Sequence, residues 1–126
     1  MNKTRTRTAE IFLDENNIVH LIMFSMVVVD IEDAIDNFLV IKNITQGKKH
    51  LRLIDARKFF KIDNKAKKFI DKKEMQENTI ARAIFISNNA RKTAANFFLR
   101  FNANKIPTKF FTDYNEAIDW LKTLRI

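Results

Sequence analysis

Cysteine is absent from this chain, and glycine and proline each occur only once. The lack of thiols excludes disulfide bonds, zinc–thiolate sites, iron–sulfur clusters and a thiol nucleophile. The single glycine, Gly47, leaves no place for a glycine-rich loop around a phosphate, and no GxSxG, P-loop or dinucleotide motif occurs. We therefore expect a protein without enzymatic activity, metal or cofactor.

Long apolar runs are also missing. The longest covers only residues 18–29 and includes His20 and Ser25, whereas a membrane-spanning helix needs about 20 apolar residues. The basic start of the chain, MNKTRTRTAE, is not followed by the apolar core of a signal peptide. We expect a cytoplasmic protein with no membrane span.

The composition that remains is typical of a folded globular protein. Apolar residues make up 46% of the 126 residues and charged residues 30%, which is too apolar for a disordered chain. A chain of this length has room for one hydrophobic core. We expect a single domain over residues 1–126.

The positive charge is confined to one region. Residues 48–73 contain eleven Lys and Arg side chains against three Asp, which accounts for the whole formal charge of +8. This concentration of charge produces a positive electrostatic field, which attracts nucleic acid, anionic surfaces or acidic proteins. A lysine-rich face can also serve only to keep a protein soluble. The lysine ridge that we expect consists of Lys61, just before a helix, and Lys65, Lys68 and Lys72 on that helix.

Hydrophobic periodicity predicts the element order ββαβαβαβα. The expected strands cover residues 8–14, 18–24, 50–56, 81–87 and 108–111. The expected helices begin at the N-caps Asp30, Asp63, Ser87 and Asp113, and the second continues to about Asn78. This order predicts an α/β fold with a mixed, mostly parallel, five-stranded sheet and four helices.

The helices show apolar stripes that we expect to face the sheet. The first has Ile31, Ala34, Ile35, Phe38, Ile41 and Ile44, the third has Ala90, Ala94, Phe97, Phe98 and Phe101, and the last has Tyr114, Ala117, Ile118, Leu121 and Leu124. Asp113 and Glu116 form a capping box, and Gly47 is the expected left-handed residue that ends the first helix.

The element order and the ending FFTDYNEAIDWLKTL resemble the STAS superfamily, in particular its stand-alone SpoIIAA-like bacterial members. The residues that carry the resemblance are Phe111, Glu116, Ala117, Trp120 and Leu121. The resemblance implies a SpoIIAA-like fold and a role as a protein-interaction switch, and some members of the superfamily bind nucleotides or lipids.

One feature of the antagonists in that superfamily is missing. The resemblance implies a phosphorylated Ser or Thr just after the third strand, but the corresponding stretch, IDARKFFKID, has no hydroxyl. None occurs between Gln46 and Thr79. A phosphoserine switch is therefore excluded at that place, and only Asp55 matches the acidic residue of the pattern.

Two chemical alternatives are weaker. Asp55, Ser87 and Lys109, with Asp14 and Glu15, imitate the phosphorylation site of a receiver domain, but the short link between the first two strands leaves no room for the required helix. His20 and His50 are the only histidines. Neither has a second ligand at metal-binding spacing, so both are more easily explained as structural residues.

The candidate site is a binding edge where two parallel strands end. Asp55, Arg57 and Lys58 follow the third strand, and Ser87, Asn88 and Arg91 follow the fourth. Ligands of open α/β sheets bind at this edge, where helix N-termini also offer free N–H groups. The alternative is structural: Asp55 pairs with Arg57 or Arg91, and Ser87 only caps its helix.

These observations leave several hypotheses. The first is a regulatory protein that binds a protein partner through this edge. The alternative is nucleic-acid or anionic-surface binding through the basic region 48–73. A small apolar ligand between the helix over residues 90–101 and the sheet is a third. A homodimer formed through the exposed edge of the first hairpin is also plausible.

Overall fold

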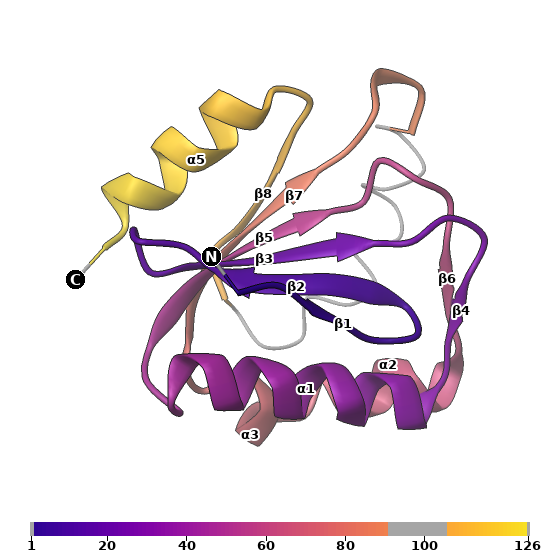
Figure 1. Ribbon diagram of the computed structural model, residues 1–126. Helices are drawn as coiled ribbons and strands as arrows, with labels where there is room; N and C mark the ends of the chain where they lie inside the picture. Colours follow the sequence, from indigo (N-terminus) through magenta and orange to yellow (C-terminus); the bar gives the residue numbers. More distant parts are fainter. Residues whose placement is uncertain (1, 91–105, 126) are drawn as a thin grey trace.

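The computed structural model describes residues 2–90 and 106–125, and its centre is a six-stranded sheet in the order β1-β2-β3-β5-β7-β8 (Figure 1). The antiparallel part comprises β1 (Thr4–Arg5), β2 (Ala9–Leu13) and β3 (Ile18–Met23). The parallel part adds β5 (His50–Asp55), β7 (Thr79–Phe85) and β8 (Thr108–Phe111). The predicted mixed α/β class is confirmed, but the predicted number of five strands is wrong.

The strand that the sequence did not predict is β1. It has only two residues, too few to show an alternating pattern. Its register on β2 pairs Thr4 with Ile11 and Arg5 with Glu10. Glu10 also accepts two long ion pairs, from Lys3 at 3.7 Å and from Arg5 at 3.8 Å. Tertiary pairing with β2 therefore defines this strand.

A second, two-stranded parallel sheet lies beyond the carboxyl ends of β3 and β5 (Figure 1). It consists of β4 (Val28–Val29) and β6 (Lys61–Ile62). These two segments follow the main strands directly, so they tie the loops after β3 and β5 to one another.

The first helix, α1 (Ile31–Thr45), has the predicted ends. Asp30 is the N-cap, and it forms a reciprocal capping box with Asp33, with hydrogen bonds of 2.8 and 3.0 Å. At the other end Gln46 and Gly47 both have positive φ, 55° and 68°. The left-handed turn thus begins one residue before the glycine that we expected to form it.

The single helix predicted over residues 63–78 is interrupted. The structure has α2 (Asn64–Ile70), with the predicted N-cap Asp63, and then a separate turn, α3 (Lys73–Gln76). Lys72 between them is extended, with φ −60° and ψ 138°. The Gln76 side chain donates to the Ile70 carbonyl at 2.7 Å, which satisfies an acceptor that the break leaves free.

The last helix, α5 (Tyr114–Thr123), covers the face of the sheet opposite to α1, α2 and α3 (Figure 1). Its N-cap Asp113 accepts from the Glu116 amide at 3.0 Å. The predicted helix after Ser87 is described only as far as a 3₁₀ turn, Asn88–Ala90. The rest of it, with the stripe Ala94, Phe97, Phe98 and Phe101, lies outside the described residues.

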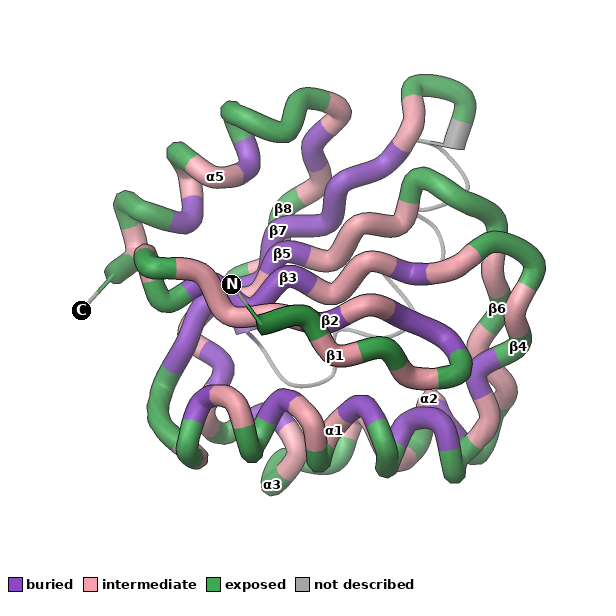
Figure 2. Tube along the Cα trace, in the orientation of Figure 1, coloured by how far each residue is buried: buried purple, intermediate pink, exposed green. Residues whose placement is uncertain are grey.

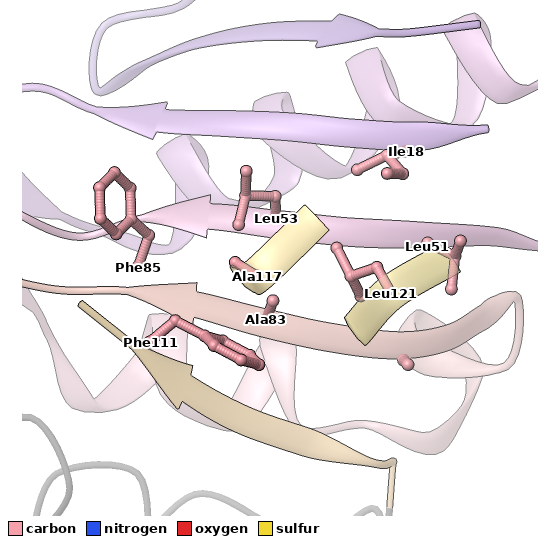
Figure 3. Packing of buried hydrophobic residues seen from close by; sticks show 9 residues of the cluster. Ile18, Leu51, Leu53, Ala83, Phe85, Phe111, Ala117 and Leu121 are labelled. Atoms are coloured by element: carbon pink, nitrogen blue, oxygen red, sulfur yellow. The ribbon is translucent and has the colours of Figure 1, made fainter. Parts of the chain in front are cut away.

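The core has one part on each face. Between α5 and the sheet, Leu121, Ala117 and Phe111 pack on Leu53 and Ala83, as Figure 3 shows. Between α1, α2 and the sheet lies the second part, whose buried members are Ala9, Ile11, Val19, Met23, Val29, Ala34, Ile41 and Ala66. β7 is buried along most of its length, and β3 and β5 are buried mainly toward their N-terminal ends, while the outer faces of the helices are exposed (Figure 2).

Three residues expected in the core are exposed. Tyr114 is 45% exposed, Ile31 37% and Ile35 36%. The two isoleucines lie on α1 and share the outer side of that helix with Leu39, which is 54% exposed. Helical spacing alone does not show that the apolar surface of α1 is wider than the area the sheet covers. Within the described part of the chain, no helix is long and apolar enough to cross a membrane.

Candidate binding edge at the ends of β3 and β5

Asp55 and Arg57 form an ion pair just beyond the end of β5. Arg57 donates from Nε to Oδ1 at 2.9 Å and from Nη2 to Oδ2 at 2.7 Å, and its backbone amide donates to Oδ1 at 3.2 Å. These bonds raise the pKa of Arg57 above its ordinary value. The guanidinium also lies 4.4 Å from the ring centre of Phe85. The pairing that the sequence left as the structural alternative is therefore present.

The end of β7 lies beside the end of β5. Asp55 and Phe85 are register partners, and the Ala56 amide donates to the Phe85 carbonyl at 2.8 Å. Ser87 and Asn88 follow immediately, and Asn88 is exposed. No hydrogen bond joins either of them to Asp55 or Arg57 within the described residues. Arg91, the sixth predicted residue, lies outside those residues.

A histidine site that the sequence did not predict lies next to this edge. His20 Nε2 is 2.8 Å from Asp14 Oδ2, and the imidazole stacks on Phe12 with ring centres 4.4 Å apart and planes 8° from parallel. Asp14 Oδ1 accepts from the amides of Asn16 and Ile18. The carboxylate thus closes the β2–β3 turn and orients the imidazole at the same time.

His20, Asp55, Arg57 and Tyr114 line one pocket of about 180 Å³ on the α5 side of the sheet, together with Lys3, Phe12, Ile22 and Leu53. Burial and the nearby Asp14 carboxylate raise the pKa of Tyr114. Among the described lining residues there is no Ser, Thr or Cys, and the phenol of Tyr114 is the one hydroxyl present.

A sequence signal for this pocket exists, although it is weak. Phe12 and His20 are register partners across the hairpin, so they face the same side of the sheet. Asp14 stands at the hairpin turn, where a carboxylate often accepts backbone N–H groups. The sequence neighbours of His20 suggest only a metal ligand or a structural residue, whereas pairing across the hairpin places the Asp14 carboxylate beside it.

Exposed apolar side chains lie beyond the pocket, around the small β4–β6 sheet. Met26 is 75% exposed, Phe59 59% and Val28 50%; we call these three residues the edge patch. The Met26 amide donates to the Phe59 carbonyl at 2.7 Å, so the two residues are neighbours. Lys61 Nζ lies 5.9 Å from the Phe59 ring centre.

The cations expected around this region are exposed as predicted. Lys58 precedes Phe59 and is exposed, and so are all four members of the basic ridge, Lys61, Lys65, Lys68 and Lys72. None of the four forms an ion pair within the described residues. The break between α2 and α3 leaves Lys72 beyond the end of α2, where it lies 5.9 Å from the Phe69 ring centre.

The receiver-domain alternative does not fit this geometry. Asp14 is engaged by His20 and by the turn amides, and Lys109 lies within β8 with Nζ 5.5 Å from the Phe111 ring centre. No group of three acidic or histidine side chains suited to a metal occurs among residues 2–90 and 106–125.

The comparison with protein families decides the assignment. The model of the domain of unknown function DUF7793 matches residues 11–125. The chain belongs to this family. A search of curated proteins finds no match to this DUF7793 chain. The family description names no activity.

The SpoIIAA-like fold inferred from the sequence is confirmed by a solved structure. An uncharacterised protein of the DUF3478 family from Shewanella loihica PV-4, described as having a SpoIIAA-like fold, matches with a TM-score of 0.60. The match covers 95% of the DUF7793 chain and 90% of that protein, at 16% sequence identity. This level of identity establishes a shared fold and nothing about function.

Proposed function

We propose that this protein is a non-enzymatic regulatory module that binds a protein partner at the edge patch. The observation that carries the proposal is the exposure of Met26, Val28 and Phe59 beside Lys58 and Lys61. The partner segment we infer has apolar side chains flanked by carboxylates.

The exposure of the edge patch supports this proposal energetically. Met and Phe side chains bury large apolar areas and frequently act as anchors in interfaces. When a partner covers an apolar patch that is exposed to solvent in the free protein, the removal of this surface from water stabilises the complex. Because the β4–β6 pairing fixes both loops that carry the patch, little ordering is needed on binding.

The charges around the edge patch favour an acidic partner. Arg57 is engaged by Asp55, so this pair contributes little net charge. Lys58 and Lys61 have no ion-pair partner within the described residues, so they make the electrostatic potential around the edge patch positive. Rim charges of this kind mainly raise the association rate and exclude partners of the same sign.

Site-specific photocrosslinking in cells tests this proposal. With p-benzoylphenylalanine at position 59, we expect one dominant protein adduct, which disappears when Lys58→Glu and Lys61→Glu are added. The matched control is the same probe at Asp119, an exposed residue of α5, where we expect no discrete adduct. Equal adducts at both positions, or an adduct unaffected by charge reversal, would refute the proposal.

A second candidate is binding of nucleic acid or an anionic surface. It is supported by the basic ridge, because all four lysines are exposed.

Homodimerisation through the N-terminal edge stays a prediction. Part of the edge of β2 is covered by β1, and sedimentation equilibrium over a range of protein concentrations would test whether a dimer forms.

A further inference from the structure

A cavity of about 130 Å³, the inner cavity, lies on the opposite face of the sheet from the His20 pocket, beneath α1, α2 and α3. Much of its wall is apolar and includes Leu21, Phe38, Ile54, Phe60, Phe69 and Met75. Phe38 and Phe69 meet edge to face, with ring centres 6.1 Å apart. Charged side chains complete the lining: Arg52, Lys67, Asp71 and Arg82.

The two arginines in this lining are neighbours. Arg52 on β5 and Arg82 on β7 are register partners, so both side chains leave the sheet on the same face. Burial, followed by the charge of Arg82, lowers the pKa of Arg52 to about 10. Burial also lowers the pKa of Arg82. A guanidinium stays protonated in proteins, so two cations lie side by side in the wall of the cavity.

Arg52 has no carboxylate partner within the described residues. Among the described lining residues Asp71 is the only carboxylate; burial raises its pKa, while the charge of Arg82 acts in the opposite direction. Arg82 donates to Thr108 Oγ1 at 3.1 Å. Arg52 donates from Nε to His50 Nε2 at 3.0 Å, and its terminal nitrogens have no further partner within the described residues. Residues 91–105, whose placement is not described, contain no Asp or Glu, so that segment has no side-chain carboxylate to supply.

We propose that the inner cavity binds a small carboxylate of about six carbons in all, most of them in an apolar body. Its carboxylate pairs with the terminal nitrogens of Arg52, since a guanidinium fork matches a carboxylate with two parallel hydrogen bonds. Its body lies against the phenylalanine side chains. The size follows from the volume, because an apolar protein cavity of about 150 Å³ holds a benzene molecule. This site is independent of the edge patch.

Calorimetric titration with a series of carboxylates tests the proposal. From butanoate to hexanoate, affinity is expected to rise roughly 3–4-fold for each methylene, as apolar burial requires, and to level off for longer chains that no longer fit. Hexanamide and hexylamine have a similar shape without the negative charge, and each is expected to bind at least about tenfold more weakly than hexanoate. Absence of saturable hexanoate binding, or equal affinity for the three compounds, would overturn the proposal.

Two substitutions locate the site. Arg52→Met removes one of two adjacent cations, and it is expected to weaken hexanoate at least about tenfold while hexanamide binding stays unchanged. Ala34→Leu places a larger side chain into the lining from α1 and is expected to weaken both compounds. Arg57→Met, on the opposite face, is the control and should leave both affinities unchanged.

Thermal unfolding of each variant checks that it is folded. Should Arg52→Met fail to fold, Ala34→Leu still decides the question. Unchanged hexanoate affinity in folded Ala34→Leu would show that the ligand does not occupy the inner cavity.

Discussion

His50 illustrates how one buried side chain depends on its protonation state. Its Nδ1 lies 3.0 Å from the Lys48 carbonyl and its Nε2 accepts from Arg52 Nε at 3.0 Å. This pattern requires a neutral imidazole with its proton on Nδ1. Burial, followed by the Arg52 charge, lowers the pKa of His50 to about 4. Protonation would therefore remove the acceptor that holds Arg52.

The lowered pKa predicts a loss of stability in mild acid. Between about pH 6.5 and pH 4 the unfolded chain binds a proton at His50 that the folded chain does not, so the free energy of unfolding falls as the pH falls through this window. From pH 7 to 4.5 the loss amounts to about 2–3 kcal/mol. Urea unfolding at several pH values would measure it.

His50→Gln is the matched control for this pH effect, because an amide can donate and accept but does not titrate in this range. The wild-type protein should lose about 2–3 kcal/mol more than this variant over the same interval. Parallel curves for the two proteins would mean that folding does not lower the pKa of His50 and would contradict this prediction.

At the scale of elements, the ends of helices depend on local chemistry more than their interiors do. The Asp30–Asp33 capping box begins α1 as the sequence predicts. The backbone at the C-terminus of α1 is strained, because Gln46, immediately before Gly47, has a left-handed conformation with φ 55°. A side chain with a Cβ atom is strained in this region.

Gln46→Gly is therefore expected to raise the free energy of unfolding by about 0.5–1 kcal/mol, since relief of strain outweighs the added flexibility of the unfolded chain. Gln46 is exposed, so little packing is lost. The control is Asn43→Gly, at an exposed helical position, which should lower stability by up to about 1 kcal/mol. Urea unfolding would compare both variants, and a destabilised Gln46→Gly would show that the side chain stabilises the turn.

At the scale of the whole molecule, charge and shape are distributed unequally. The region 48–73 accounts for the entire net charge, and its cations have two different environments. Arg52 lies in the wall of the inner cavity, whereas the basic ridge is exposed. A sum over the sequence treats both groups alike, although only exposed charges attract a large polyanion.

Nucleic-acid binding through the ridge makes a quantitative prediction. If four lysines contact phosphates of mixed-sequence duplex DNA, the logarithm of the affinity should fall with the logarithm of salt with a slope of about −3 to −4. Fluorescence anisotropy would measure it, and Lys65→Glu, Lys68→Glu and Lys72→Glu together should abolish binding. The same reversal at Lys42, Lys109 and Lys122 is the control, and lack of binding at low salt would exclude this function.

Much of the fold could be predicted from local patterns. The alternation of apolar strands and amphipathic helices predicts the parallel part of the sheet, and Asp30, Asp63 and Asp113 are the N-caps of α1, α2 and α5. The strands β1, β4 and β6 were missed because two residues carry no period. The break at Lys72 was missed because α2 and α3 each continue a helical pattern.

The candidate site was less predictable, since its residues come from distant segments. Asp55 and Arg57 are two residues apart, and their pairing was one of the alternatives that the sequence left open. His20 came beside Asp55 only through the pairing of β3 with β5, and Met26 came beside Phe59 through the β4–β6 loops.

Local patterns along the chain are enough to establish the order of the main elements, most of the helix caps, the absence of a hydroxyl after the third strand and the concentration of charge in residues 48–73. These properties depend on neighbours along the chain. The tertiary structure decided which cations are buried and which apolar side chains remain exposed, because burial depends on which elements lie above a residue. Arg52 and Arg82 are thirty residues apart in the chain and lie side by side only because β5 pairs with β7.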